Sequence, residues 1–235
     1  MSVDWTPHRF SGGVLALDVT NTVVHRNRPD LRFDRFDDAA EIARFAAAAQ
    51  VHRAMEIGGQ ALHTADRVEM KPVVVAIRET TDALFRDAAV SGGLKPSLLA
   101  PFLRAAADAM ALSPLEGEMP AGQRGSAKEA PQPSGTNPSA TLSGLPATSP
   151  SRGERTIPRL HFETALGFSA LSLLPPETHR RIRVCPNCAW LFLDRSRNRS
   201  RTWCDMAVCG NRSKARRHYR KRRIGEADDA DVSKG

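Results

Sequence analysis

The chain has 235 residues, with 34 Lys and Arg against 26 Asp and Glu, and its formal net charge is +8. This length fits one or two ordinary domains and excludes a large multidomain enzyme. No signal-peptide pattern is present, and the longest uncharged, mostly apolar stretch, 164–176, is too short to span a bilayer, so we expect a soluble, cytoplasmic protein with no membrane contact.

The first 112 residues are predicted to form a mainly helical domain. Residues 14–19, Val-Leu-Ala-Leu-Asp-Val, suit a strand and a buried helix equally. Three amphipathic helices are expected after them: one from Asp37-Asp38, one from Pro72 to Gly92-Gly93, and one from Pro96. The residues expected on their buried faces are Ile42, Phe45, Ala46 and Ala49 in the first, Val73, Ile77, Leu84 and Ala88 in the second, and Leu99, Phe102, Leu103, Ala106 and Met110 in the third.

The composition changes at residues 113–155. These 43 residues contain seven Pro, six Gly and seven Ser but no aromatic residue, so they cannot bury enough apolar surface to offset the entropy lost on ordering. They are predicted to be a disordered insertion. A short strand is expected over 156–163 and a helix over 162–174, and the segment 156–178 is expected to return to the first domain. Residues 225–235 are expected to form an acidic flexible tail.

Four cysteines follow in the pattern C-x2-C-x15-C-x4-C, at Cys185, Cys188, Cys204 and Cys209. Because a C-x2-C knuckle brings two sulfurs to one point, a second pair can complete a tetrahedral metal site. Two disulfides are the alternative, but disulfides are rare in the cytoplasm, and we predict Zn²⁺. Four thiolates leave no position for water, so a structural zinc is expected to hold a treble-clef-like or ribbon-like finger over 179–224.

Most of the positive charge lies in this C-terminal segment. Residues 180–223 hold fifteen Lys and Arg against two acidic residues, so they carry +13 and the remainder of the chain carries −5. Such a segment repels itself and is typical of proteins that bind nucleic acid. An extended loop is expected to place alternating arginines on one side, and a helix over 211–223 is expected to present two basic faces. The predicted contacts are Arg195, Arg197, Asn198, Arg199 and Arg201 in the loop, and Arg212, Lys214, Arg216, Arg217, Arg220, Lys221 and Arg223 in the helix.

The apolar residues of this segment have their own interpretation. The aromatic side chains could stack on single-stranded bases, but beside zinc ligands we favour a small core for Trp190, Phe192 and Trp203. An apolar stripe of Val208, Ala215 and Tyr219 is expected to lie against the zinc knuckle.

Two motifs resemble a known bacterial group. The stretches Val184 to Asn198, Arg201-Thr-Trp-Cys-Asp-Met and Cys209-Gly-Asn-Arg-Ser-Lys resemble the CGNR zinc-finger module. The upstream Leu15-Ala-Leu-Asp-Val-Thr-Asn-Thr, with the helices after it, is similar to the ABATE domain, which precedes that finger in proteins described as stress-induced transcription regulators. The resemblance implies that the four cysteines bind zinc and that the finger binds DNA rather than RNA. It also implies that the N-terminal domain, 1–112 with 156–178, senses a small-molecule effector or mediates association, for example as a homodimer.

Within the ABATE-like motif, Asp18, Asn21 and Thr22 have two interpretations. They could form a polar ligand-binding site. Alternatively, Asp18 or Thr20 caps a helix and Asn21 anchors a turn, which we favour because such residues cap local structure so often.

We therefore predict an α+β protein, with a mostly α-helical N-terminal domain and a small four-cysteine finger, that acts as a zinc-dependent, DNA-binding transcription regulator. One alternative is an RNA- or ribosome-binding zinc protein. The other is an enzyme with an appended finger, but no nucleophile–base arrangement, phosphate loop or carboxylate pair supports catalysis, and we do not expect an enzyme.

Overall fold

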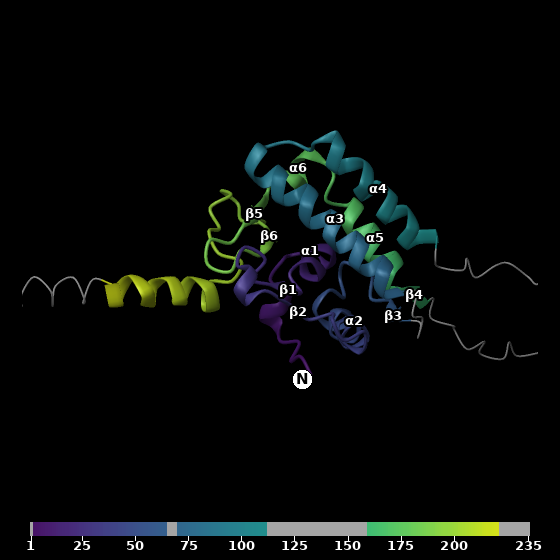
Figure 1. The fold of residues 1–235 in the computed structure, drawn as a ribbon, viewed down its shortest axis with the longest axis horizontal. Coiled ribbons are helices and arrows are strands. Elements are labelled where there is room, and N and C mark those ends of the chain that lie inside the picture. The colour runs from purple at the N-terminus through teal and green to yellow at the C-terminus, as the bar shows by residue number, and fades with distance from the viewer. Residues whose placement is uncertain (1, 65–69, 112–158, 221–235) are drawn as a thin grey trace, which may run out of the picture. The chain divides into compact units, whose positions relative to one another are not determined.

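The computed structural model describes residues 2–64, 70–111 and 159–220 (Figure 1). The predicted insertion and acidic tail, together with Lys221 and Arg223, lie outside these ranges. Within them the fold is α+β as predicted, because helices dominate and the strands form three two-stranded sheets. No helix in the described ranges is long and apolar enough to cross a membrane.

A short central helix resolves the ambiguity at residues 14–19. Residues Leu15–Thr20 form α1, and every side chain of this helix is buried. A 3₁₀ helix, Pro7–Phe10, precedes α1, and an antiparallel pair, β1 (Val23–Val24) with β2 (Phe33–Asp34), follows it, with a second 3₁₀ helix, Pro29–Leu31, between these strands. Because α1 is apolar on nearly all sides, it lies inside the core rather than on its surface.

The three amphipathic helices are present, and their bounds differ slightly from the prediction. The first, α2 (Ala40–His52), buries all four predicted residues, and the Asp38 carboxylate accepts a hydrogen bond from the Ala40 N–H at 2.9 Å. The second, α3 (Met70–Ser91), begins two residues before Pro72, because proline is tolerated in a first helical turn. Its buried face includes Val74 in place of the predicted Val73.

The third helix, α4 (Pro96–Ala111), buries the predicted Phe102 and Ala106, but Leu99 and Met110 are only partly buried and the prediction for Leu103 is wrong. Leu103 is 42% exposed, and the buried face consists of Phe102, Ala105, Ala106 and Ala109. The small side chains allow a close approach to α5, where a Cβ added at Gly167 would lie 3.4 Å from the Ala106 carbonyl oxygen. Leu103 lies outside the face of α4 that is formed mainly by alanines and packs on α5, so its side chain is exposed to solvent.

A parallel strand pair joins the segments on either side of the predicted insertion. β3 (Ala61–His63) pairs with β4 (Arg159–His161), which is the described part of the strand expected over 156–163. The helix α5 (Phe162–Leu171) starts immediately afterwards and packs against α1, α3 and α4, and α6 (Pro176–His179) follows it. The segment after β4 thus contributes directly to the core of the first 111 residues.

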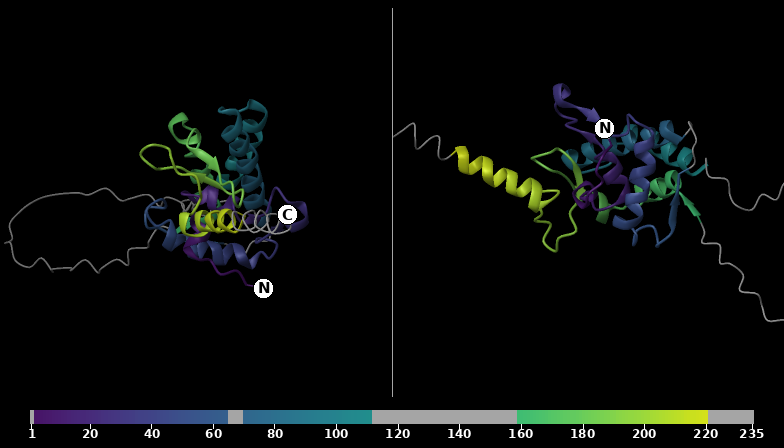
Figure 2. Two further views of the ribbon diagram at one scale, coloured as in Figure 1. Left: turned by 90° about the vertical axis from the view of Figure 1, so that its left-hand side faces the viewer. Right: turned by 90° about the horizontal axis from the view of Figure 1, so that it is seen from below.

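The last elements form the cysteine-containing segment. The hairpin β5 (Ile182–Val184) and β6 (Leu191–Leu193) lies against α1 and α3 (Figure 2). Its residues Ile182, Leu191 and Leu193 belong to the same core as α1 to α5. A π-helical turn, Met206–Gly210, then leads into a helix over 211–220. A hairpin followed by a helix that starts at the second cysteine pair matches the treble-clef-like alternative.

Candidate metal centre and nucleic-acid interface

The four cysteine sulfurs converge from three local structures. Cys185 and Cys188 lie on the tight turn between β5 and β6, which the Cys185 N–H closes by donating to the Trp190 carbonyl at 2.8 Å. Cys204 precedes the π-helical turn and Cys209 lies within it. All four sulfurs lie within 4.8 Å of one another, and three of the four residues are buried. The structure therefore brings both predicted pairs to one point.

The spacing of the sulfurs fits a metal ion rather than disulfides. The sulfurs of Cys188 and Cys204 are 3.5 Å apart and those of Cys204 and Cys209 are 3.6 Å apart, whereas a disulfide bond is about 2 Å long. Zinc–thiolate bonds of about 2.3 Å in a tetrahedron separate the sulfurs by about 3.8 Å. This donor set fits Zn²⁺, and four thiolates would fill its coordination sphere without a position for substrate or water.

The crowding of the sulfurs also perturbs their titration. Hydrogen bonds from the thiols of Cys188 and Cys204 lower the pKa of Cys185, and the same contacts raise the pKa of Cys188 and Cys204. A group of thiols at this spacing therefore resists full ionisation by itself. A divalent cation at the centre favours the thiolate form of each sulfur.

Two residues next to the cysteines connect the metal site to the basic helix. The Asn187 side chain donates to Cys209 Sγ at 3.3 Å and accepts from Arg216 Nη1 at 3.1 Å. The Asp205 carboxylate accepts from the N–H groups of Ala207 and Val208 at 2.7 and 3.3 Å, and so caps the start of the helical segment. Asn187 and Asp205 thereby fix the direction in which the helix over 211–220 extends from the metal site.

The predicted loop of alternating arginines is a compact turn, so the expectation of an extended loop is wrong. The fully buried Asp194 carboxylate accepts from Ser196 N–H at 2.9 Å, from Ser196 Oγ at 2.6 Å and from Arg201 N–H at 3.1 Å. Burial disfavours its charged form, but these hydrogen bonds prevail and lower the pKa of Asp194. Arg199 takes a left-handed backbone conformation, with φ of 51°, which lets the chain turn back. We call residues 195–200 the arginine turn.

Most of the predicted nucleic-acid contacts are exposed to solvent. The exposed set comprises Arg195, Arg197, Asn198, Arg199, Arg212, Lys214, Arg216, Arg217 and Arg220. In the described part of the chain, no cation of this set lies within 4 Å of a carboxylate oxygen. The helical spacing of Arg212, Arg216 and Arg220 places them on one face, as predicted for these three.

Arg201 differs from the rest of its set. Its guanidinium donates to the carbonyl groups of Trp203 and Cys204 and lies 5.0 Å from the centre of the Phe192 ring. This side chain is therefore directed into the finger. Phe192, Trp190 and Trp203 pack around the cysteines as the predicted small core.

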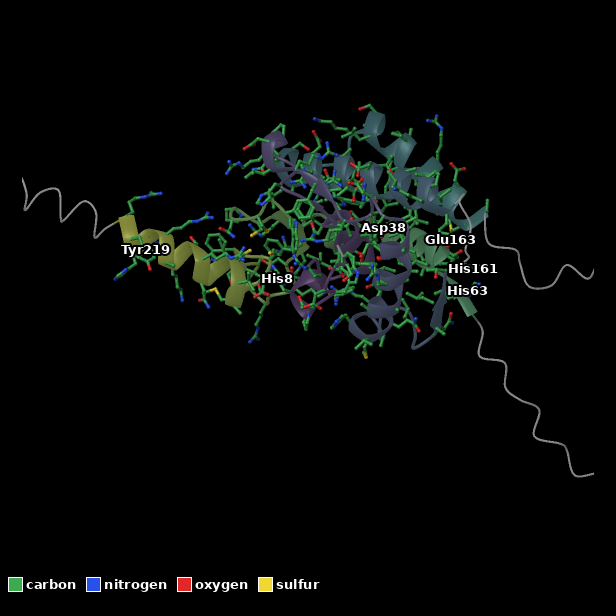
Figure 3. All side chains as sticks on the ribbon, turned by 60° about the horizontal axis from the view of Figure 1, so that its bottom comes forward. His8, Asp38, His63, His161, Glu163 and Tyr219 are labelled. Atoms are coloured by element: carbon green, nitrogen blue, oxygen red, sulfur yellow. The ribbon has the colours of Figure 1, made fainter. Side chains whose placement is uncertain are left out.

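The predicted apolar seam on the basic helix is wrong. Tyr219 is 66% exposed, Ala215 is also exposed, and Tyr219 lies toward the far end of the helix (Figure 3). Beyond the first helical turn, the helix contacts the knuckle through the polar side chain of Arg216, which donates to Asn187, and not through an apolar stripe.

Asn21, Gly12 and Arg86 provide hydrogen bonds that hold the finger. The Asn21 amide donates to the Leu191 carbonyl and accepts from the Leu191 N–H, both at 2.9 Å. The Leu193 N–H donates to the Gly12 carbonyl at 2.8 Å, and Arg86 Nη1 donates to the Ala189 carbonyl at 2.9 Å. The main chain of the finger is thus hydrogen-bonded to residues that flank α1 and to α3, in addition to the shared apolar core.

Asp18 and Thr22 are also engaged within the protein. The Asp18 carboxylate accepts from the Gly12 N–H at 2.8 Å and from Arg53 Nε at 2.6 Å, so it orients the turn before α1 rather than capping a helix. Burial raises the pKa of Asp18 to about 7, although Arg53 opposes this. The Thr22 hydroxyl donates to the Val19 carbonyl and accepts from Arg78. In the described structure these side chains and Asn21 stabilise the fold around α1, and Asn21 also holds β6 of the finger.

Several of these roles were missed from the sequence. Two of them had a local signal in the sequence. Asp194 lies two residues before Ser196, a spacing typical of a turn, and Asp205 directly precedes a helical segment, as an N-cap residue does. The role of Asn187 at Cys209 and that of Asn21 at Leu191 had no local signal, because the partners lie 22 and 170 residues away.

Comparison with curated proteins and with solved structures finds no match to this chain. Comparison with protein families finds one for its C-terminal part. Residues 181–222, which contain all four cysteines, the arginine turn and the basic helix, match the family model of the CGNR zinc finger.

Proposed function

We propose that the protein is a zinc-dependent, DNA-binding transcription regulator of the cytoplasm, with an ABATE-type N-terminal domain. The observation that carries the proposal is the exposed basic helix, which starts at the four-cysteine centre and whose cations have no carboxylate partner among the described residues. Unpaired arginines and lysines held on a rigid support are suited to contacts with phosphates.

In this proposal the cysteines and the basic residues of the finger have different roles. Zn²⁺ held by Cys185, Cys188, Cys204 and Cys209 would supply cross-linking rather than catalysis, since the thiolates fill its coordination sphere. The arginine turn and the helix face formed by Arg212, Arg216 and Arg220 contact the backbone of duplex DNA. Arg197, Asn198 and Arg212 reach base edges. We do not assign an enzymatic activity to the chain.

The N-terminal domain has a different part in the proposal. It senses a small-molecule effector or mediates association between copies. Its contacts with the finger support a regulatory coupling. Asn21 at the end of α1 and Gly12 before α1 are both hydrogen-bonded to β6, so a displacement of α1 would move β6 as well.

Titration of fluorescent duplex DNA with the protein at several salt concentrations tests the proposal. If about six phosphates are neutralised, log K falls with log salt with a slope of about −5, and chelation of the zinc abolishes binding. A competition with structured RNA at fixed salt decides between DNA and RNA. Affinity that does not change with salt, or that survives verified zinc removal, overturns the proposal.

A further inference from the structure

Three arginines from separate segments gather where the N-terminal domain meets the finger. Arg9 lies in the 3₁₀ helix Pro7–Phe10, Arg35 follows β2, and Arg212 lies at the start of the basic helix. Burial and the charge of Arg9 lower the pKa of Arg35 to about 10. Burial and the charge of Arg212, opposed by Asp4, lower the pKa of Arg9. Arg9 therefore lies close enough to Arg35 and to Arg212 to be repelled by the charge of each.

The contacts around Trp190 define the geometry of this junction. The His8 ring stacks on Trp190 with centroids 5.3 Å apart, and its Nδ1 lies 2.8 Å from the Asp205 carboxylate that caps the helical segment. Figure 3 shows His8 beside the base of the basic helix. The Arg35 guanidinium lies 5.6 Å from the centre of the Trp190 ring. The residue next to Arg9 and the side chain of Arg35 thus both pack on one aromatic side chain of the finger.

Two buried donors at this junction lack partners in the described part of the chain. Arg35 is only 8% exposed, and its guanidinium donates a hydrogen bond to the Asn21 carbonyl at 3.3 Å. The buried Nε of Arg9 and the buried Nε1 of Trp190 have no hydrogen-bond partner among the described residues.

The carboxylates nearby are already engaged or lie in solvent. Asp34, the residue before Arg35, is held by Arg78 at 2.5 and 2.7 Å. Asp205 is engaged by His8 and by main-chain N–H groups, and Asp4 is exposed. Asp4 and Asp34 act on Arg9 and Arg35 from a distance, but among the described residues neither arginine forms an ion pair with a carboxylate. Since a partly buried cation without a close counter-charge is costly, an anion from outside the described chain would stabilise this junction.

We propose that Arg9 and Arg35 bind a phosphate group, and that in the DNA complex this group is a backbone phosphate. The DNA-binding surface then includes the N-terminal domain, which explains why the finger is fixed to α1 and not attached by a free linker. The identification of the phosphate as that of DNA rests on the proposed function. The phosphate site itself can be tested without DNA.

The first experiment measures binding of inorganic phosphate to the full chain from the shift of its thermal midpoint, at constant ionic strength adjusted with chloride. The variants are Arg9→Gln and Arg35→Gln, and Arg104→Gln on the exposed side of α4 is the control with the same charge change. We expect phosphate affinity to fall at least about tenfold in the first two variants and to be unchanged in the control. General stabilisation by the salt acts on all variants alike and cancels in the comparison.

The second experiment repeats the DNA titration with the same proteins. Each lost phosphate contact reduces the magnitude of the salt slope by about 0.9, and the loss is the same for different DNA sequences. Zinc content and far-UV circular dichroism verify folding, and if Arg35→Gln does not fold, the half-buried Arg9 carries the test.

Each outcome has one meaning. An unchanged phosphate response in Arg9→Gln overturns the phosphate site, whatever DNA does. A phosphate response that depends on Arg9 in a protein that binds no DNA supports the site and overturns the proposed function. A phosphate response that depends on Arg9, with an unchanged DNA salt slope, overturns the assignment of the phosphate to the DNA backbone.

Discussion

The Asn21 side chain pairs with both main-chain polar groups of Leu191, 170 residues away. One edge of β6 pairs with β5. On the other edge, the Asn21 amide makes the two main-chain hydrogen bonds that a neighbouring strand would make with Leu191. Two residues farther along, the Leu193 N–H donates to the Gly12 carbonyl on the same strand. Because β6 is held at both positions, the arginine turn that follows it starts from a fixed point on the N-terminal domain.

Replacement of Asn21 by Ala is expected to destabilise the whole described unit. The change leaves the buried N–H and carbonyl of Leu191 without partners, and each such group costs about 1–3 kcal/mol. We expect the free energy of unfolding to fall by about 2–4 kcal/mol in urea denaturation. Asn198→Ala, on the exposed arginine turn, is the matched control and should change it by less than about 0.5 kcal/mol. Equal stability of the two variants would show that the amide pair contributes nothing.

Removal of the metal is expected to weaken the N-terminal domain as well as the finger. Ile182, Leu191 and Leu193 belong to the main core, so loosening the hairpin exposes apolar surface of α1 and α3. If about 2–3 kcal/mol is lost, the thermal midpoint of the helical signal in circular dichroism falls by roughly 4–12 °C after chelation. Readdition of zinc, but not of magnesium, should restore it. A helical signal that melts at the same temperature with and without the metal would mean that the finger folds separately.

The pH dependence of stability should carry the signature of Asp18. In the unfolded chain Asp18 loses its proton near the ordinary aspartate pKa of 3.8, whereas burial raises the pKa in the folded protein to about 7. The unfolded state therefore binds fewer protons between these values, and the contribution of Asp18 to stability falls as pH rises from about 4 to about 7.

The comparison with Asp18→Asn isolates this contribution from other titrating groups. We expect the free energy of unfolding of the unaltered protein, relative to that of the variant, to decrease by about 1 kcal/mol or more over this pH range. A difference between the two proteins that is constant with pH would place the pKa of Asp18 outside the range.

The parts of the fold that could be predicted from the sequence are those set by local pattern. Ile42, Phe45, Ala46 and Ala49 repeat with helical spacing and are all buried in α2. The cysteine spacing likewise predicts a shared metal site, because a C-x2-C turn restricts where its sulfurs can point. Leu103 shows the limit of such patterns, since its exposure depends on how closely α4 approaches Gly167 of α5.

The contacts that give the finger its orientation could not be predicted in this way. The sequence favoured local capping over a ligand site for the polar residues Asp18, Asn21 and Thr22. Their partners lie 35, 170 and 56 residues away, a separation that no periodicity encodes. The alternation of arginines over 195–201 predicted an extended strand-like loop, yet a single buried carboxylate, Asp194, folds it into a turn. One buried carboxylate therefore determined the conformation of the loop, against the alternating pattern of the residues that follow it.

Asp194 allows the shape of the arginine turn to be separated from its charge. If charge alone governs DNA affinity, Asp194→Asn strengthens binding, because it removes one negative charge from the finger. The structure predicts the opposite. An Asn at this position keeps one acceptor oxygen, loses the one that receives the Arg201 N–H or the Ser196 pair, and so loosens the turn. Loss of a pre-organised conformation for one arginine costs about 0.5–1.5 kcal/mol and should weaken DNA binding about three- to tenfold.

The control for this experiment is Asp108→Asn, which makes the same charge change on an exposed residue of α4. Fluorescence anisotropy at fixed salt measures both affinities, and zinc content verifies that the cysteine site is intact in both proteins. We expect weaker binding in Asp194→Asn and no weakening in Asp108→Asn, because only the first residue holds the arginine turn. Tighter binding in both variants would show that the finger attracts DNA through its net charge and that the geometry of the turn has no part in recognition.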